Sequence, residues 1–494
     1  MSQLFVRTRS FINFKIILRV IGMLLLIEAM FMLIPLVCAL IYGEGSSAVS
    51  FLICIGITGG AGGALLSLRP NTREMGKREA ILLTAMTWVI LSLFGMLPFL
   101  FCSTHLSVTD SFFETMSGFT TTGATVLSTL ADVPHSILLW RCLIQWVGGL
   151  GIVMFTLAVV PMLNYQGGMQ LYNAEMTGVT HDKLRPRVSY TAKGLWGVYI
   201  VLTATLILLL IFSDMDFFNA LCYGLSTMST GGFTTSDMSL GTWDSIYIKC
   251  VMSVFMFLGG VNFALIYYVA LGRPRGLLRN TALRVYLWMI LGCYILLTAN
   301  IFMNGMAKSV EDVTIDPLFQ TISIISSTGI TEPDFNDWGA ISTLVLIVMM
   351  FMGACAGSTS GGAKIDRFII LFKFLKNEFY KIMHPSTVTS VTINGKGLPN
   401  AIVTKTLAFL FVYAVVIVLG GMLLSLLGMP LRSGLFSALS AISSTGLGTS
   451  ITGLTGNFGN IPDAAKWILS FIMLVGRLEL FTVLLIFTPT FWKK

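Results

Sequence analysis

Long apolar runs recur along the whole chain, and this feature constrains the fold most. A helix needs about 20 mostly apolar residues to cross the hydrocarbon core of a bilayer. Runs of that order lie at 11–42, 50–68, 80–104, 190–213, 281–304 and 400–427. Only 11% of the 494 residues are charged, against about 25% in an ordinary soluble domain. The sequence therefore predicts an all-α polytopic membrane protein and excludes a soluble enzyme.

The basic residues are concentrated in alternate connecting segments. With the N-terminus placed in the cytoplasm, most of the 31 Lys and Arg residues fall in the inward segments 1–19, 69–79, 165–194, 272–284, 364–405 and 493–494. The positive-inside rule then predicts that both termini are cytoplasmic. Topology and contact with anionic membrane lipid explain the net charge of +8, so no nucleic-acid partner is predicted.

The eight cysteines and four histidines are dispersed through the chain. No CxxC pair or other metal-ligand spacing is present, and the cysteines stand singly in apolar runs. They are interpreted as small buried hydrophobic residues. The sequence therefore predicts no tightly bound cofactor and no resident metal.

Four short segments share one pattern and align without a gap. They are Asp110–Gly123 (DSFFETMSGFTTTG), Asn219–Gly232 (NALCYGLSTMSTGG), Asp316–Gly329 (DPLFQTISIISSTG) and Ser433–Gly446 (SGLFSALSAISSTG). Asp, Asn and Ser are preferred helix N-caps, and Pro317 would be the first helical residue of the third copy. The ten or eleven residues that follow make a helix of about 15–18 Å, roughly half the hydrocarbon thickness. Each segment is therefore predicted to re-enter the membrane.

An apolar run precedes each of these segments, and another follows it at 137–163, 243–271, 340–383 and 464–489. The unit is a helix, a pore helix, a filter loop and a helix, repeated four times around one pore. Two extra helices precede the first unit, which gives ten spanning segments. The predicted boundaries are 1–79 for the extra helices and 80–186, 187–280, 281–398 and 399–494 for the pseudo-symmetric repeats.

The loop at the end of each pore helix is the candidate selectivity filter. Glycine tolerates positive φ, so such a loop can turn successive carbonyls toward one axis. Irregular backbone at membrane depth is stable only where it lines water or binds a ligand, and neutral oxygens suit a monovalent cation. In the alternative interpretation, each glycine only caps a helix C-terminus. The candidate residues are Thr121, Thr122, Gly123, Thr230, Gly231, Gly232, Ser327, Thr328, Gly329, Ser444, Thr445 and Gly446.

The fourfold layout, the filter sequences and three further motifs resemble the Trk/Ktr/HKT superfamily of potassium transporters. The motifs are Trp140–Gly149 (WRCLIQWVGG), Gly353–Gly362 (GACAGSTSGG) and Gly476–Leu484 (GRLELFTVL). The resemblance covers nearly the full length and is closest to the membrane subunit of bacterial Trk uptake systems. Some plant members associated with sodium permeation carry serine in place of the first filter glycine. This sequence has Gly123, which favours potassium.

The resemblance implies several properties of the protein. K⁺ is the transported ion and binds at the filter only. The protein is a homodimer in the bacterial inner membrane, with one pore per subunit. A cytoplasmic nucleotide-binding ring subunit (TrkA-type) regulates it.

Residues 353–362 interrupt an apolar run with glycines and hydroxyl side chains, so the helix is predicted to break near mid-membrane. The spacing does not match a P-loop, because Ala363 precedes Lys364, or a nucleophile elbow, because Thr359 stands where serine is required. In the family the matching segment is an intramembrane loop that obstructs the pore below the filter. The resemblance thus implies a gate, and a structural kink is the alternative. The gate residues are Gly353, Gly357, Ser358, Thr359, Ser360, Gly361 and Gly362.

Arg477 is a charged residue inside the last apolar run, two residues before Glu479. A charge within a span usually faces a cavity or a partner. In the family a basic residue at this position faces the pore below the filter, so Arg477 is assigned to the gate. The alternative is that Arg477 only ties helices together.

The sequence favours potassium uptake through a channel-like pore, driven by the membrane potential. The alternative is a potassium symporter coupled to sodium or protons, with Glu28 and Glu479 as the acidic residues inside spans. An intramembrane enzyme is disfavoured because the spans lack paired aspartates, HExxH or a Ser–His constellation. The protein is therefore not expected to be an enzyme.

Overall fold

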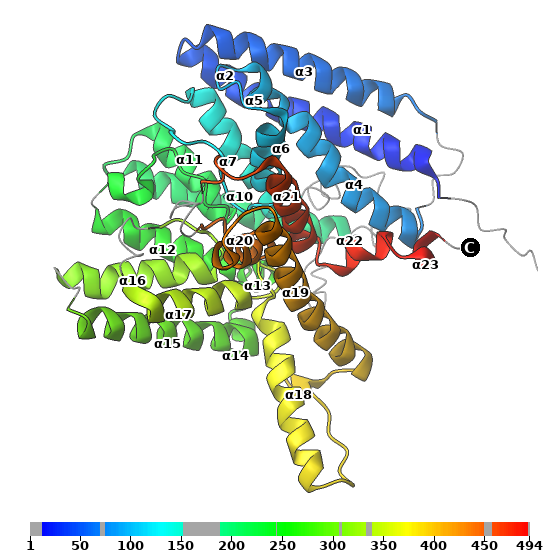
Figure 1. Cartoon of the computed structure of the whole chain (residues 1–494), viewed down its shortest axis with the longest axis vertical. Helices are drawn as coiled ribbons and strands as arrows, with labels where there is room; N and C mark the ends of the chain where they lie inside the picture. Colours follow the sequence, from blue (N-terminus) through cyan, green and yellow to red (C-terminus); the bar gives the residue numbers. More distant parts are fainter. Residues whose placement is uncertain are drawn as a thin grey trace, which may run out of the picture.

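The computed structural model describes residues 12–69, 75–151, 188–243, 245–305, 309–331, 338–448 and 457–492. These residues are mostly helical, with one short antiparallel β pair (Figure 1). Both chain ends, most of the basic segment 165–194 and the second half of the run 137–163 lie outside the described residues. The predicted orientation of these parts therefore stays a prediction.

The two extra N-terminal spans lie along one edge of the molecule (Figure 1). They consist of α1 (Phe14–Phe31) continued by α2 (Leu33–Ile41), and α3 (Gly45–Leu66). A Cβ atom on Gly22 of α1 would lie 2.8 Å from the carbonyl oxygen of Gly62 in α3. Small residues of this kind let two membrane helices approach backbone to backbone.

The rest of the chain repeats one order of elements. The first helices are α4 (Lys77–Gly95) with α5 (Leu97–Phe101), α10 (Val188–Ile211), α15 (Thr281–Met303) and α19 (Asn400–Leu426). The short helices predicted to re-enter the membrane are α6 (Val108–Phe119), α11 (Phe217–Met228), α16 (Val310–Ile325) and α20 (Leu431–Ser443). The helices that follow them are α7 (His135–Gly149), α12 (Ile246–Gly260), α17 (Gly339–Met352) and α21 (Asp463–Arg477).

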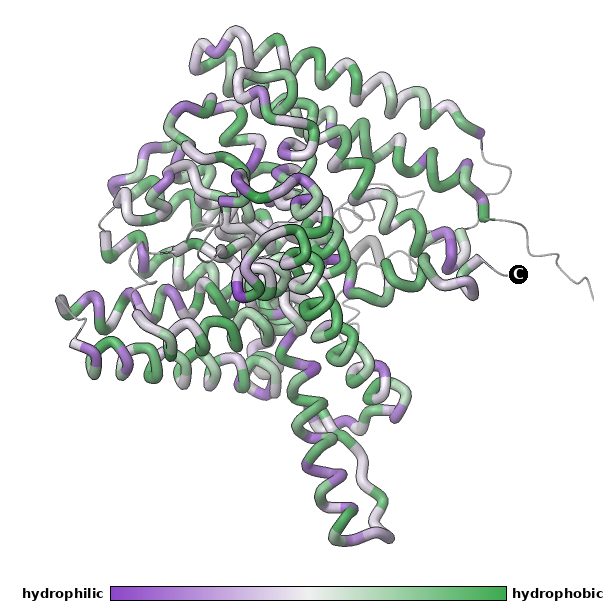
Figure 2. The backbone as a smooth tube through the Cα atoms, in the orientation of Figure 1, coloured by the Kyte–Doolittle hydropathy of each residue, from purple (hydrophilic) through white to green (hydrophobic). Residues whose placement is uncertain are grey.

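The helix α18 and several short elements connect or extend these helices. They are η2 (Ser239–Thr242), α13 (Phe263–Ala270), α14 (Arg275–Arg279), α18 (Ile365–Met383), β1 (Thr392–Ile393), β2 (Lys396–Gly397), α22 (Phe481–Ile486) and α23 (Pro489–Trp492). The end of α18 and the hairpin that follows it project from the body of the molecule (Figure 1). Polar and apolar residues alternate along α18, whereas the other long helices are more uniformly apolar (Figure 2).

Three of the helices that follow the loops, α12, α17 and α21, end at a break inside the predicted apolar run, and the continuation of α7 lies outside the described residues. Among the described residues, six helices are long and apolar enough to cross a membrane. A seventh span is possible if α12 and α13, bent by 106° between Gly260 and Phe263, are counted as one. Breaks also separate α17 from α18 and α21 from α22. Only the α17 break was predicted, because an apolar composition does not reveal where tertiary packing interrupts a helix.

The re-entrant helices begin earlier than predicted, and this corrects the proposed N-caps. Ser107, Asp216 and Ser309 cap α6, α11 and α16 through their side chains, and α20 follows Pro430. Asp110 and Asn219 stand three residues after the capping side chain, whose oxygen accepts a hydrogen bond from their backbone N–H. The first turn therefore contains residues that the alignment had assigned to the cap.

Pro317 lies inside α16 and not at its first position. Proline cannot donate the helical hydrogen bond to the carbonyl four residues earlier. That carbonyl, of Val313, instead accepts a hydrogen bond from the Thr298 hydroxyl of α15 at 3.1 Å. A neighbouring helix thus satisfies the group that proline leaves free.

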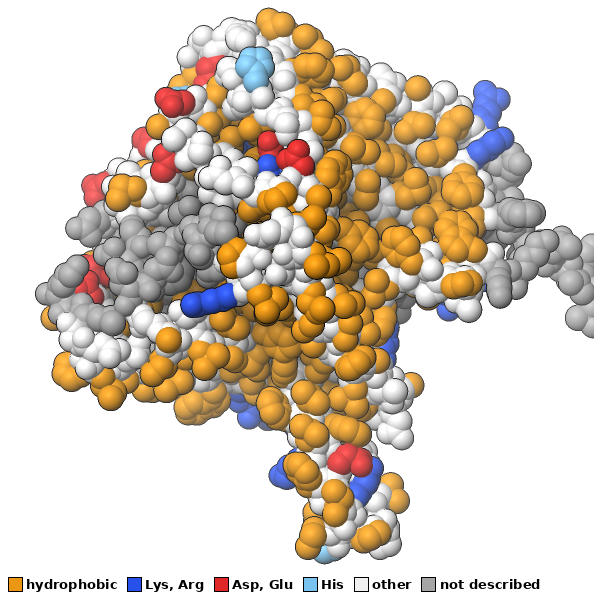
Figure 3. Space-filling model, in the orientation of Figure 1, with side chains coloured by type: hydrophobic (Ala, Val, Ile, Leu, Met, Phe, Trp, Pro, Cys, Tyr) orange, Lys and Arg blue, Asp and Glu red, His pale blue; other side chains and the backbone are white. Residues whose placement is uncertain are grey.

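Apolar side chains cover much of the visible surface, as expected for a protein in contact with lipid (Figure 3). Examples on α3, α15 and α19 are Leu52, Trp288 and Phe411, which are 57%, 71% and 71% exposed. Most of the Asp and Glu side chains visible in Figure 3 lie on the side away from α18. Six cysteines are buried as predicted, whereas Cys250 is exposed and Cys293 is partly exposed.

Candidate functional site

The four candidate filter loops lie together and form a closed ring. Each filter glycine packs against the carbonyl oxygen of the residue that precedes the glycine of the next loop, and the fourth glycine packs against the first loop. The distances from the position of a Cβ atom to that oxygen are 2.2 Å for Gly123 and Gly231, 2.1 Å for Gly232 and Thr328, 2.1 Å for Gly329 and Thr445, and 2.2 Å for Gly446 and Thr122. The ring closes only because these four positions lack a side chain.

The backbone of the four loops is the same, and it is unusual. The glycines have φ between +74° and +82°. The residue two positions earlier also has positive φ, at 53–55° for Thr121, Thr230, Ser327 and Ser444. A Thr or Ser residue rarely adopts this conformation, and it persists only where the surroundings enforce it.

Each pore helix ends one or two residues before the first of these two positive-φ residues. The next amide, in Thr122, Gly231, Thr328 and Thr445, donates to a serine carbonyl of its own pore helix at 2.8–3.0 Å. This bond, five residues back, is the one that closes a Schellman-type helix end. The left-handed capping residue is thus a Thr or Ser and not the glycine. The interpretation of the glycine as a simple helix cap is therefore wrong.

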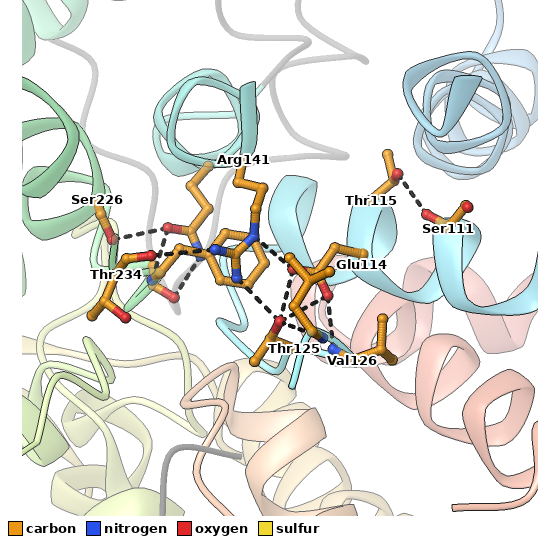
Figure 4. A network of polar contacts seen from close by, with 12 residues as sticks. Ser111, Glu114, Thr115, Thr125, Val126, Arg141, Ser226 and Thr234 are labelled. Atoms are coloured by element: carbon orange, nitrogen blue, oxygen red, sulfur yellow. Dashed lines mark hydrogen bonds and ion pairs between the residues drawn. The ribbon is translucent and has the colours of Figure 1, made fainter. Parts of the chain in front are cut away.

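A buried ion pair stands behind the first filter loop. Arg141 Nε of α7 lies 2.7 Å from Glu114 Oε1 of α6, and both side chains are at most 1% exposed. Glu114 also accepts hydrogen bonds from the Thr125 hydroxyl and the Val126 amide. Arg141 donates to the Thr234 carbonyl of the second repeat at 3.2 Å (Figure 4). The pair thus joins the segments that follow the first and second filter loops.

Breaking this pair is expected to destabilise the protein strongly. Glu114→Gln or Arg141→Met leaves one buried charge without its counter-charge, which typically costs about 3–5 kcal/mol. Thermal unfolding of the purified protein in detergent measures the loss. Glu378→Gln is the matched control, because Glu378 and Lys381 form a pair that is 41% exposed on both sides and contributes under about 1 kcal/mol. Equal unfolding temperatures for the three variants would contradict this expectation.

Two lysines join consecutive repeats through three further ion pairs. Lys249 of α12 contacts Glu311 and Asp316 of α16 at 2.9 and 2.8 Å. Lys466 of α21 contacts Asp110 of α6. Asp110 and Asp316, predicted to be N-caps, therefore bind lysines that begin the second helix of the preceding repeat. The connection from α21 back to α6 joins the last repeat to the first.

The predicted gate segment lies against the ends of the pore helices. The Thr359 amide and hydroxyl donate to the Gly259 carbonyl of α12 at 3.2 and 3.1 Å. The Gly361 amide donates to the Ser327 hydroxyl of the third filter loop at 2.6 Å. A Cβ atom on Gly361 would lie 2.0 Å from the Ser443 carbonyl at the end of α20. The segment therefore contacts the second, third and fourth repeats.

Three glycines in this segment, Gly353, Gly357 and Gly362, have positive φ. The Gly357 carbonyl accepts from the amide of Phe263, the first residue of α13. Ser360 contacts the third filter loop through Ser327, at 3.2 Å between hydroxyl oxygens. The Ser358 hydroxyl bonds within the segment, to the Cys355 carbonyl at 2.6 Å. The predicted gate residues between Gly353 and Gly362 thus form one segment, and Arg477 lies outside it at the end of α21.

Arg477 at the end of α21 joins this segment to the first repeat. Its guanidinium donates to the Thr359 carbonyl at 3.1 Å and to the carbonyls of Gly148 and Gly149 in α7, both at 2.6 Å. Arg477 therefore does tie helices together, as the alternative interpretation held. The same contacts place its positive charge beside the gate segment, so the two interpretations are compatible.

A second arginine, Arg367, joins the helix that follows the gate segment to the break after α21. Arg367 of α18 lies 2.7 Å from Glu479 in the break between α21 and α22. Its guanidinium also stacks over the Phe409 ring of α19, 3.8 Å from the centroid. Glu479 and the adjacent Leu480 have positive φ, at 54° and 33°. Arg367 therefore pairs with a residue of a strained turn that lies just after Arg477.

Sequence reasoning singled out the four loops, residues 353–362 and Arg477, which the structure brings together, but not the supporting side chains behind them. Glu114, Arg141, Gln145 and Arg367 are all nearly buried and hydrogen-bonded. A signal was present in the motif WRCLIQWVGG, where Arg141 and Gln145 lie four residues apart and so share one helix face. Two polar residues on one face of an apolar helix indicate a buried polar partner.

Comparison with known proteins identifies close relatives. A family model described as TrkH, cation transport protein, matches residues 49–494. The Trk system potassium uptake protein TrkH of Escherichia coli (strain K12) is 35% identical over 98% of this chain and 100% of its own length. TrkH of Vibrio parahaemolyticus is 36% identical, with the same coverage. The crystal structure of the potassium transporter TrkH from Vibrio parahaemolyticus matches with a TM-score of 0.87 at 32% identity and covers 97% of this chain and all of that one.

Proposed function

Because this chain belongs to the TrkH family of cation transport proteins, we propose that it takes up K⁺ through a channel-like pore whose selectivity filter is the ring of four loops. It is a transport protein and not an enzyme. The contact of each filter glycine with the carbonyl of the next loop carries the proposal. Four loops that meet in this way can present main-chain oxygens to one axis.

The chemistry of the ring suits potassium. Carbonyl and hydroxyl oxygens replace the water that a K⁺ ion loses on entry, at little cost for a weakly hydrated monovalent cation. The pore helices end at the ring, and their C-terminal dipoles, each equivalent to roughly −0.5 charge, favour a cation without fixing it. An inside-negative potential of 100 mV contributes about 2.3 kcal/mol per charge, enough for about 50-fold accumulation. No cofactor is required, and K⁺ is the cargo.

In this proposal, residues 353–362 and Arg477 form the gate. The segment lies against the inner ends of the pore helices and is held by hydrogen bonds to Gly259 and Ser327. Its three positive-φ glycines give it an irregular backbone that a small rearrangement could move aside. We further propose a homodimer in the bacterial inner membrane, regulated by a cytoplasmic TrkA-type nucleotide-binding ring. These assignments extend the membership of the relatives in Trk systems.

Flux into vesicles tests the proposed function. Purified protein in proteoliposomes is expected to take up rubidium-86 or K⁺ when a potential, inside negative, is imposed, with Na⁺ competing weakly. The current should reverse at the potassium equilibrium potential at every pH and Na⁺ concentration. A reversal potential that follows the pH or the Na⁺ gradient would instead favour the symporter.

Substitution of Glu28 distinguishes an uncoupled channel from a proton-coupled symporter. It is 5% exposed in α1, and neither carboxylate oxygen has a hydrogen-bond partner among the described residues. Apolar side chains of α4 and α7, among them Leu91 and Leu143, surround it. Glu28→Gln is expected to leave K⁺ flux within about twofold, because an uncoupled pore needs no titratable group here. Loss of flux in this variant, measured across a pH series, would support coupling.

A further inference from the structure

The second filter loop differs from the other three in its internal hydrogen bonds. In the first, third and fourth loops, the hydroxyl before the filter glycine bonds a hydroxyl two residues earlier. The pairs are Thr122 with Thr120 at 2.9 Å, Thr328 with Ser326 at 2.8 Å, and Thr445 with Ser443 at 2.9 Å. The second loop has Gly231 at this position and cannot form the bond. Two consecutive glycines also leave its backbone the least restricted of the four.

A glutamine from another repeat occupies the place of the missing side chain. A Cβ atom on Gly231 would lie 2.4 Å from Cδ, 2.5 Å from Oε1 and 2.8 Å from Nε2 of Gln145. Gln145 belongs to α7 of the first repeat and is fully buried. In the first, third and fourth loops a threonine side chain fills this space. In the second loop the Gln145 side chain of a neighbouring helix fills it.

Gln145 makes three hydrogen bonds there. Its Nε2 donates to the Gly231 carbonyl at 2.7 Å. Its Oε1 accepts from the Ser226 hydroxyl at 3.0 Å and from the Phe233 amide at 3.2 Å. The side-chain amide of Gln145 thus bonds a residue before the two glycines, one of the glycines, and the residue after them. Figure 4 shows Ser226 and Thr234 of the second repeat approaching the first repeat here, on the side of Arg141.

Among the first, second and fourth repeats, a polar side chain stands at this position only in the first. Gly148 in α7 and Gly476 in α21 each pack on the end of a pore helix. The residue three positions before this glycine is Gln145 in α7 and Met473 in α21. The corresponding residue before Gly259 in α12 is Met256. Both methionines are buried and apolar. The polar amide thus occurs in α7, the helix that packs against the one loop without a threonine.

The Gly231 carbonyl is one of the four oxygens of the ring. It faces Gly123 of the first loop as Thr328, Thr445 and Thr122 face their own neighbours. Any rotation of the Gly231 peptide therefore also disturbs the packing of Gly123. From these contacts we propose that Gln145 is a positioning residue for ion selectivity. It holds the Gly231 carbonyl in the ring through its Nε2 and fills the space that a threonine side chain fills in the other three loops. This inference rests on the function proposed above.

Selectivity measurements on four variants test the inference. Gln145→Met keeps the size of the side chain, removes the three hydrogen bonds and reproduces the residue of α12 and α21. It is expected to lower the K⁺ to Na⁺ flux ratio about fivefold to tenfold, the effect of losing one to two hydrogen bonds on an equilibrium constant. Gln145→Ala is expected to do the same. Gly231→Thr alone should lose flux, because its Cβ would overlap the head of Gln145.

The double variant Q145A/G231T provides the decisive comparison. Gly231 does not have positive φ, so its backbone accepts a threonine. With Gln145 shortened, the new hydroxyl has room to bond Ser229, as its counterparts do in the other loops. The double variant is expected to recover flux and selectivity relative to both single variants. Monodispersity and the unfolding temperature of each variant are measured in parallel.

Several results would overturn the inference. One is a wild-type flux ratio in Gln145→Met, with or without a change in unfolding temperature. Another is a double variant no better than the poorer of its parents. A folded wild-type protein without K⁺ flux would instead reject the proposed function before any variant is compared. The two failures are therefore distinguishable.

Discussion

Gly329→Ala is expected to abolish potassium flux while leaving the protein folded. The added Cβ would lie 2.1 Å from the Thr445 carbonyl oxygen of the next loop, far inside van der Waals contact. That oxygen must move away from the axis, and the ring opens at one of its four joints. A displacement near 1 Å at a site built for close coordination can cost about 100-fold in rate. Rubidium-86 uptake into proteoliposomes measures the loss.

A matched control separates the clash from backbone strain. Gly43, in the turn between α2 and α3, has φ of +70° against +75° for Gly329, but nothing lies within 4 Å of its Cβ position. Gly43→Ala therefore carries a similar left-handed penalty, roughly 1–2 kcal/mol, without touching the ring. Its flux should match the wild type. Equal losses in both variants would show that strain, and not closure of the ring, determines the result.

Arg477→Met is expected to raise potassium flux, by as much as two decades. A positive charge about 5 Å from a passing cation, at an effective dielectric near 20, opposes it by about 3 kcal/mol. The same substitution removes the hydrogen bonds from Arg477 to the Thr359 carbonyl of the gate segment and to Gly148 and Gly149. Both consequences favour an open pore. Single-channel or macroscopic currents from reconstituted protein measure the change.

Arg477→Lys distinguishes the effect of the positive charge from the effect of the hydrogen bonds to the gate segment and to α7. Lysine keeps the positive charge but lacks the planar fork that reaches carbonyls on two segments at once. Flux near the wild-type level in this variant would assign the barrier to charge. Flux as high as in Arg477→Met would assign it to the hold on the gate segment. Unchanged or lower flux in Arg477→Met, with an unchanged unfolding temperature, would contradict a role in gating.

The local features of the fold followed from the sequence because they depend on local composition. The apolar runs located the long helices within a few residues, for example 281–304 against Thr281–Met303. The gapless alignment located the glycine of each of the four loops, all with positive φ, because a position that must lack a Cβ holds glycine in every copy of the repeat. The break after Met352 was likewise visible in the cluster of glycines that follows it.

The errors arose where another helix supplied what the local sequence lacked. Pro317 was placed at a helix start because proline disrupts an isolated helix, yet Thr298 of α15 satisfies the freed carbonyl. Asp110 and Asp316 were assigned to caps, whereas lysines from preceding repeats bind them. The break between α12 and α13 was missed because Gly259, Gly260 and Asn262 interrupt the run 243–271 less obviously than the glycine cluster at 353–362 interrupts its own run.

The sequence by itself determined a fourfold repeat of membrane helices and re-entrant segments with glycines at equivalent positions, because span length and freedom from Cβ are properties of single residues and short windows. Tertiary structure alone decided that the glycines meet in a ring, that Glu114 pairs with Arg141, and that Gln145 bonds the Gly231 carbonyl in the second loop. These contacts join residues from different helices, and their partners are set by how the repeats close around one axis.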